Sequence, residues 1–158
     1  MTKEQIQQYT LRITQANKTQ IIVILYDMIL DDVQDAQKNY ANGDFEAFKN
    51  HCNHIKRCVA DLMEALDFNY QISHNLMQLY LFVNREASTA VIRKDPTRLE
   101  IIQEIASNLK EAFAQISEQD PSGPIMENTQ TVYAGLTYGR GDLNENLQDQ
   151  GMSRGFRV

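Results

Sequence analysis

Apolar residues recur every three or four positions along four stretches of the chain, which is the period of an α-helix. The stretches cover residues 17–42, 45–66, 72–90 and 99–116. The second stretch is the most regular, because its apolar positions alternate between spacings of three and four, as in a heptad repeat: Phe45, Phe48, Cys52, Ile55, Val59, Leu62 and Leu66. The pattern predicts four helices.

Turn-forming residues separate these predicted helices. Gly43 and Pro96 are the only glycine and proline before residue 120, and each falls between two helical stretches. Asp44 is placed to cap the second helix, and Asp95 with Pro96 supplies an N-cap and a first-turn proline for the fourth. Short connections reach only the near end of the next helix, so we expect an all-α fold, an antiparallel up-down four-helix bundle.

The helical spacing also predicts which residues face the interior. The first helix contributes Ile22, Leu25, Tyr26, Ile29, Val33, Ala36 and Tyr40. The third contributes Ile72, Leu76, Leu79, Val83, Ala87 and Ala90, and the fourth Leu99, Ile102, Ala106, Leu109, Phe113 and Ile116. Each set forms one apolar stripe, which is typical of a helix that packs against a core.

Segments of different composition flank the bundle. Residues 1–16 form an N-terminal arm with a short apolar ridge of Ile6, Tyr9 and Ile13. Residues 17–120 form the bundle, and residues 121–158 form a tail that holds six of the seven glycines and two of the three prolines. Because this composition disfavours helix, we expect the tail to be extended or partly disordered.

Three of the predicted helices carry more apolar residues than one inward stripe requires. Ile21, Ile24 and Met28 point away from the stripe of the first helix, and Met77, Leu81 and Ile92 lie opposite that of the third. Ile101 and Ile105 widen the stripe of the fourth. This surplus predicts a surface on which an amphipathic helix of a client lies. Alternatively, the N-terminal arm, the tail or a second copy of the chain covers it.

Composition and charge exclude several classes of partner. The 15 Lys and Arg residues against 21 Asp and Glu give a formal net charge of -6, which disfavours nucleic acid. No apolar run approaches the roughly 20 residues of a membrane span, and the N-terminus lacks the apolar core of a signal peptide. We therefore expect a cytoplasmic protein without direct membrane insertion.

The chain shows no pattern typical of catalysis or of a cofactor site. A di-iron bundle needs Glu-x-x-His motifs, and none occurs. His51 and His54 form a His-x-x-His pair, but the helical spacing points both mostly outward, so we expect a solvated pair and no metal. Asp31, Asp32 and Asp35 are likewise expected on a solvated face. We predict that the protein is not an enzyme and uses no cofactor.

Several elements together resemble one family, the FliS family of flagellin-specific export chaperones. They are an arm with Ile6 and Tyr9, the run Leu25-Tyr26-Asp27, the Gly43-Asp44 turn, the run from Ile72 through Asn75 to Tyr80, then Arg85 and Lys94-Asp95. The resemblance covers most of residues 1–120. Their order and spacing carry the resemblance more than any single motif does.

The resemblance implies a cytoplasmic chaperone that binds the C-terminal segment of flagellin and prevents premature polymerisation. The complex would then go to the cytoplasmic domain of the flagellar type III export gate. We predict that the client-binding surface consists of the surplus apolar residues together with three residues of the family motif, namely Ile21, Ile24, Met28, Met77, Leu81, Ile101 and Ile105 with Asn75, Tyr80 and Arg85. Ile6, Tyr9 and Ile13 would act in gate docking or arm release. The alternative is a homodimeric helical bundle that acts as a structural or adaptor module.

Overall fold

The computed structural model describes residues 1–126, and this part of the chain contains five α-helices and no strand. The helices are α1 (Lys3–Thr14), α2 (Lys18–Ala41), α3 (Phe45–Glu64), α4 (Gln71–Arg93) and α5 (Arg98–Glu118). The prediction of an all-helical fold is confirmed. The chain divides into two compact units, one of Lys18–Ser122 and one that holds Met1–Asn17 with the chain from Gly123 onward.

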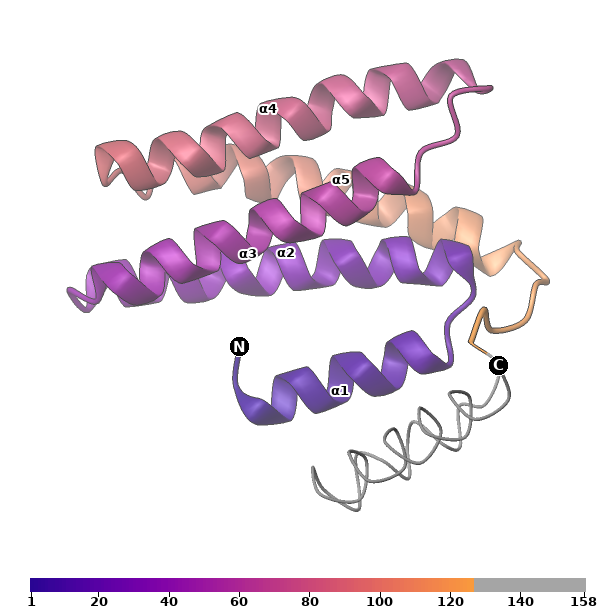
Figure 1. Cartoon of the computed structure of the whole chain (residues 1–158), viewed down its shortest axis with the longest axis horizontal. Helices are drawn as coiled ribbons and strands as arrows, with labels where there is room; N and C mark the ends of the chain where they lie inside the picture. Colours follow the sequence, from indigo (N-terminus) through magenta and orange to yellow (C-terminus); the bar gives the residue numbers. More distant parts are fainter. Residues whose placement is uncertain (127–158) are drawn as a thin grey trace, which may run out of the picture. The chain divides into compact units, whose positions relative to one another are not determined.

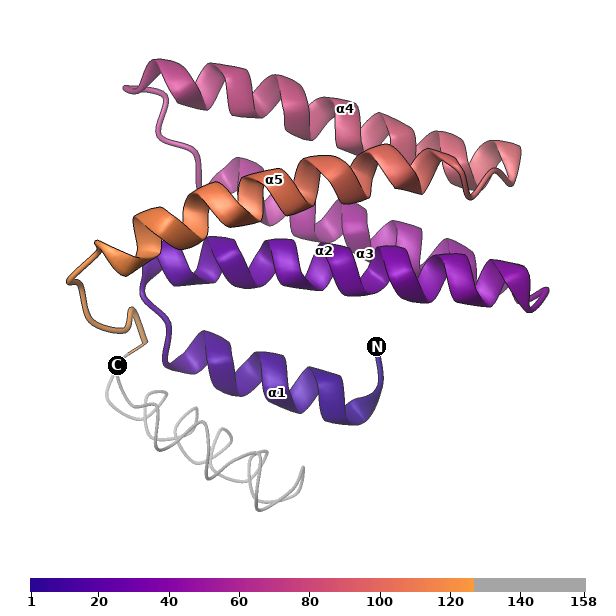
Figure 2. The ribbon, with the colours of Figure 1, turned by 180° about the vertical axis from the view of Figure 1, so that it is seen from behind.

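The larger unit consists of the four long helices α2 to α5. Helices α3 and α5 each pack against both α2 and α4, so the four helices enclose one interior. Figures 1 and 2 show that successive helices of this unit run in opposite directions. Short connections explain this arrangement, because each one joins the near ends of two neighbouring helices.

The interior of this unit is filled mainly by the residues that the helical spacing predicts. On α3 the five seam residues from Phe48 to Leu62 are all buried. Tyr26, Ile29 and Val33 of α2 are at most 2% exposed, as are Leu99 and Ile102 of α5. Close packing of such side chains supplies most of the favourable free energy of folding.

The helix ends follow local backbone chemistry. Gly43 has a φ of 80°, which a glycine adopts without steric cost, and the Asp44 side chain accepts a hydrogen bond from the Ala47 N–H at 3.0 Å. The predicted stop and cap are therefore confirmed. The predicted start of the last helix is two residues too early: Asp95 Oδ1 accepts hydrogen bonds from Thr97 N–H and Oγ1–H, and α5 begins at Arg98. The Asp95 side chain closes a turn before the helix.

The smaller unit contains α1, which the sequence analysis treats only as an arm with an apolar ridge. A capping box begins this helix, because Thr2 Oγ1 accepts from the Gln5 N–H while Gln5 Oε1 accepts from the Thr2 N–H. In the same unit the Ile125 N–H donates to the Ala16 carbonyl at 3.1 Å. The predictions made for the tail beyond residue 126 lie outside the described residues.

Three residues predicted to face the interior are exposed instead. Ile72 is 60% exposed, Leu79 is 37% exposed and Ile116 is 53% exposed. Ile72 and Ile116 lie near helix ends, where a neighbouring helix does not cover the whole apolar stripe. Helical periodicity predicts the side of a helix on which a residue lies, but not how far the neighbouring helix extends.

Candidate functional site

The outer face of α4 carries the apolar stripe that the sequence analysis expects there. Leu81 is 48% exposed and Ile92 is 80% exposed, while Met77 on the same face is half-buried. Positions 77, 81 and 92 fall on one side of the helix, since their separations are close to whole numbers of turns. These three residues are called the outer stripe below. The predicted exposure of Leu81 and Ile92 is confirmed.

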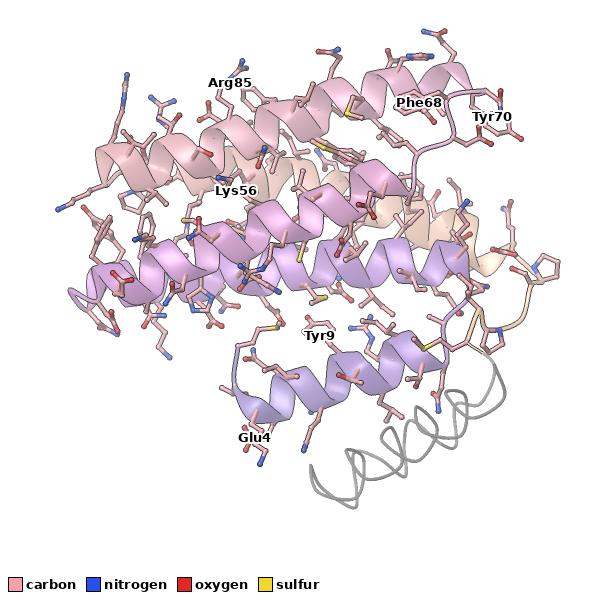
Figure 3. The ribbon with its side chains drawn as sticks, viewed as in Figure 1. Glu4, Tyr9, Lys56, Phe68, Tyr70 and Arg85 are labelled. Carbon is pink, nitrogen blue, oxygen red and sulfur yellow. The ribbon has the colours of Figure 1, made fainter. Side chains whose placement is uncertain are left out.

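Polar members of the predicted surface lie on the same helix. Asn75 and Arg85 are exposed, and the Arg85 guanidinium lies over the ring of Phe82, 5.5 Å from its centroid. Figure 3 shows Arg85 extending outward from α4. The ring attracts the guanidinium electrostatically, so Phe82 and Arg85 form a cation–π pair on α4.

A second group of exposed apolar residues lies at the start of α4, where the sequence analysis does not predict one. Phe68 is 47% exposed and Tyr70 is 65% exposed, and both lie in the connection from α3, as Figure 3 shows. The Phe68 ring packs against His74, with 5.2 Å between ring centroids. Ile72 and Leu79 are exposed as well, but the helical spacing places them on the other side of α4 from the outer stripe. Two aromatic residues in the short connection between α3 and α4 are the sequence feature that indicates this exposed group.

Tyr80 does not lie on the exposed surface where the predicted client site places it. Its side chain is 3% exposed, and its hydroxyl shares a hydrogen bond of 2.6 Å with the hydroxyl of Tyr26 on α2. Burial raises the pKa of both phenols above the ordinary value of 10.0. An exposed client contact at Tyr80 is therefore wrong, because the buried hydroxyl finds its partner inside the bundle.

The predicted exposed stripe on α2 is also wrong in part. Ile24 is only 4% exposed, although it does not belong to the core cluster of the bundle, and Ile21 and Met28 are half-buried against that cluster. Exposing large apolar side chains to water costs free energy, so the folded chain covers them where it can. On α5, Ile101 and Ile105 are also half-buried and pack against the core. These residues border the core more than they form an open face.

The arm residues predicted to act in gate docking all lie on α1. Ile6 is 50% exposed and Ile13 is half-buried. The Arg12 guanidinium lies over the Tyr9 ring at 5.4 Å from its centroid. Spacings of three and four residues place Ile6, Tyr9 and Ile13 on one side of the helix, so the predicted ridge has a helical backbone.

A polar cluster inside the bundle unit contradicts two further predictions. Asp32 of α2 is 1% exposed, so it is not on a solvated face. His51 of α3 bonds to Asp32 Oδ1 through Nδ1 at 2.8 Å, and His54 Nδ1 bonds to Asp32 Oδ2. The histidine side chains are 13% and 21% exposed, so they do not point into solvent. The helical spacing of α3 alone could not predict this, because α2 covers the flank of its apolar seam.

Cys58 lies next to this cluster. Its Sγ is 4.0 Å from His54 Nδ1, and burial raises the pKa of the thiol to about 12, with the nearby Asp32 carboxylate adding to the shift. Among the described residues, Asp32, His54 and Cys58 are the group whose ligand atoms converge, all within 4.8 Å of one another. This cluster and the outer stripe of α4 are separate features with different chemistry.

Comparison with known families identifies the chain. The model of the family described as flagellar protein FliS matches residues 1–120. The chain belongs to the FliS family. Membership gives it a general role as a chaperone in flagellar assembly, and the matched residues include all five helices. A search of curated proteins found no match.

The hydropathy of the helices agrees with the absence of a long apolar run in the sequence. Among residues 1–126, no helix combines the length and the apolar character that a membrane crossing requires.

Proposed function

We propose that this FliS-family chain is a cytoplasmic chaperone for flagellin. It binds the C-terminal segment of flagellin, prevents premature polymerisation and delivers the client to the cytoplasmic domain of the flagellar type III export gate. The observation that carries the proposal is the outer stripe of α4, where Leu81 and Ile92 are 48% and 80% exposed on a helix whose opposite face already fills the core.

The dimensions of the stripe suit a helical client. Met77 and Ile92 are 15 positions apart, which corresponds to about 22 Å along a helix, or about four turns. A client helix with apolar residues at i, i+4 and i+7 can lie against a stripe of this length. Segments that build a filament expose such apolar faces before assembly, so covering them prevents premature association.

The client surface in this proposal is centred on α4 and not on α2. Arg85 lies one turn from Leu81, beside the outer stripe, whereas Asn75 is exposed on another side of α4. Ile101 and Ile105 are half-buried proposed contacts on α5. Ile21 and Met28 remain proposed contacts at the border of the core, whereas Ile24 and Tyr80 are buried and are left out of the proposed contacts. For the arm, we propose that Ile6 and Ile13 act in gate docking, whereas Tyr9 is 7% exposed and is left out of the proposed contacts.

Calorimetry with a peptide from the C-terminal end of the host's own flagellin tests this proposal. Leu81→Asp places a charge in the outer stripe and should weaken peptide binding by at least about tenfold, because the carboxylate loses its hydration under the client. Ala60→Asp, at an exposed position of α3, is the matched control and should bind as the unchanged protein does. Equal affinities of both variants, or no binding by the folded unchanged protein, would contradict the proposal.

The exposed stripe also favours a second candidate, the homodimeric structural or adaptor module. Two copies that meet through α4 would cover Leu81 and Ile92 without any client. Light scattering at several concentrations separates the candidates. A dimer that Leu81→Asp dissociates, together with the absence of peptide binding, would favour the module over the chaperone.

A further inference from the structure

The polar cluster between α2 and α3 has a donor set that the chaperone role does not use. Asp32 supplies a carboxylate oxygen from α2, and His54 and Cys58 supply a ring nitrogen and a sulfur from α3. His54 and Cys58 are four positions apart, so their side chains lie on the same side of the helix, one turn from each other. Two helices thus direct three different ligand atoms to one point.

We propose that Asp32 Oδ2, His54 Nδ1 and Cys58 Sγ bind a zinc-class divalent cation between α2 and α3. Carboxylate oxygen, imidazole nitrogen and thiolate sulfur are the ligand atoms that Zn²⁺ takes in proteins, at bond lengths of about 2.0–2.3 Å. Tetrahedral bonds of that length hold ligand atoms about 3.2–3.7 Å apart. The three atoms lie within 4.8 Å of one another, so small side-chain movements bring them to bonding positions.

His51 has a different role in this site. Its Nδ1 bonds to Asp32 Oδ1, the carboxylate oxygen that the cation leaves free, at 2.8 Å. A hydrogen bond of this kind fixes the orientation of a ligating carboxylate and commonly changes metal affinity by about 10–100-fold. His51 is therefore a positioning residue, and its removal should weaken the site without abolishing it.

Proton balance sets the conditions for binding. The cation takes the place of the proton between His54 Nδ1 and Asp32; that proton moves to Nε2 of the same ring, so His54 stays neutral and offers Nδ1 as a ligand. Cys58 must lose its S–H proton to solvent, because the thiolate and not the thiol is the ligand. His54 is 21% exposed, so water and the cation reach the site from the His54 side.

The full-length, reduced protein is titrated with Zn²⁺ by calorimetry and with Co²⁺ by absorption spectroscopy. We expect one equivalent of each metal and a near-ultraviolet band of thiolate-to-cobalt charge transfer. Cys58→Ser should abolish that band, His54→Gln should reduce affinity by more than about 100-fold, and His51→Gln should reduce it by about 10–100-fold. Zn²⁺ should raise the melting temperature of the unchanged protein, but not that of Cys58→Ser or His54→Gln.

The chain offers a matched control for each ligand type. Cys52→Ser changes the other buried thiol of α3, and His74→Gln changes the remaining histidine, which is exposed on α4. Both controls should bind like the unchanged protein. Binding of less than one equivalent, or equal binding by His54→Gln and His74→Gln, would overturn the proposal. Should Cys58→Ser fail to fold, absence of the charge-transfer band in the unchanged protein would also overturn it.

Discussion

Helices α3 and α4 are similar in length but place their large apolar side chains differently. On α3 the seam from Phe48 to Leu62 is buried, and its members are at most 2% exposed. On α4 two of the inward positions are Ala87 and Ala90, both fully buried, whereas Leu81 and Ile92 remain exposed. The large apolar side chains of the α3 seam thus pack in the core, whereas some of those on α4 remain on the surface. Stability and client binding are expected to depend on different helices.

The largest expected contrast comes from the same substitution made on both helices. Leu62→Ala on α3 removes a side chain that is 2% exposed and should reduce the free energy of unfolding by about 2–5 kcal/mol. Leu81→Ala on α4 removes one that is 48% exposed and should change it by no more than about 0.5 kcal/mol. Urea unfolding of both variants measures the difference. Comparable losses would show that α4 is as deeply packed as α3.

A second test concerns the inner face of α4. Tyr80→Phe removes one partner of the 2.6 Å hydroxyl pair and leaves the Tyr26 hydroxyl buried without it, which should cost about 1–3 kcal/mol. The double variant Tyr26→Phe with Tyr80→Phe removes both hydroxyls and should recover part of the loss, as a double-mutant cycle would show. Additive losses would mean that the two hydroxyls do not depend on each other.

The same pair predicts how stability varies with alkaline pH. Burial raises the pKa of Tyr26 and Tyr80 above 10.0, so both stay neutral in the folded state while the unfolded chain loses their protons near pH 10. Their contribution is complete below that pH and decreases above it, by about 1.4 kcal/mol per pH unit for each tyrosine. Urea midpoints between pH 8 and 11 should fall less steeply for the double phenylalanine variant. Parallel slopes would contradict buried, neutral phenols.

The smallest expected effect lies at the end of α4. Lys94 has a φ of 52°, in the left-handed region that favours glycine, and its Nζ lies 4.9 Å from the centroid of the Phe45 ring. Lys94→Gly relieves the backbone strain but removes the cation from the ring, so we expect a net gain of about 0.5 kcal/mol or less. Thermal unfolding measures it, and Lys94→Ala, which keeps the strain and loses the cation, should be less stable than both.

The sequence analysis predicts the long helices well and the short one poorly. The predicted stretch 17–42 corresponds to α2 (Lys18–Ala41), and 45–66 corresponds to α3. Both predictions succeed because a long amphipathic pattern and the Gly43-Asp44 turn determine helix and helix end from neighbouring residues alone. Helix α1 has only 12 residues, but Thr2 and Gln5 have the capping-box spacing that announces it. The sequence therefore carries a start signal for α1 that does not depend on its length.

Among the candidate site residues, too, some were predicted correctly from the sequence and others were not. The periodicity of α4 correctly predicts exposed Leu81 and Ile92, because both lie opposite a well-defined inner face. The client contact at Tyr80 comes from the family resemblance, and its side chain is buried against Tyr26 of another helix. On α2, helical periodicity fails for Ile24, whose burial depends on what lies outside its own helix. It fails for Asp32 as well, since its bonds to His51 and His54 form only where α2 meets α3.

The amino-acid sequence by itself determined the helical fold class, the positions of the main turns and the resemblance to the FliS family. Those properties depend on residue order and on spacings within a few turns of helix. Only the tertiary structure decided that α4 keeps large apolar residues in water and that a carboxylate, two imidazoles and a thiol meet between α2 and α3. The physical reason is that burial is a property of neighbours in space, which no single helix contains.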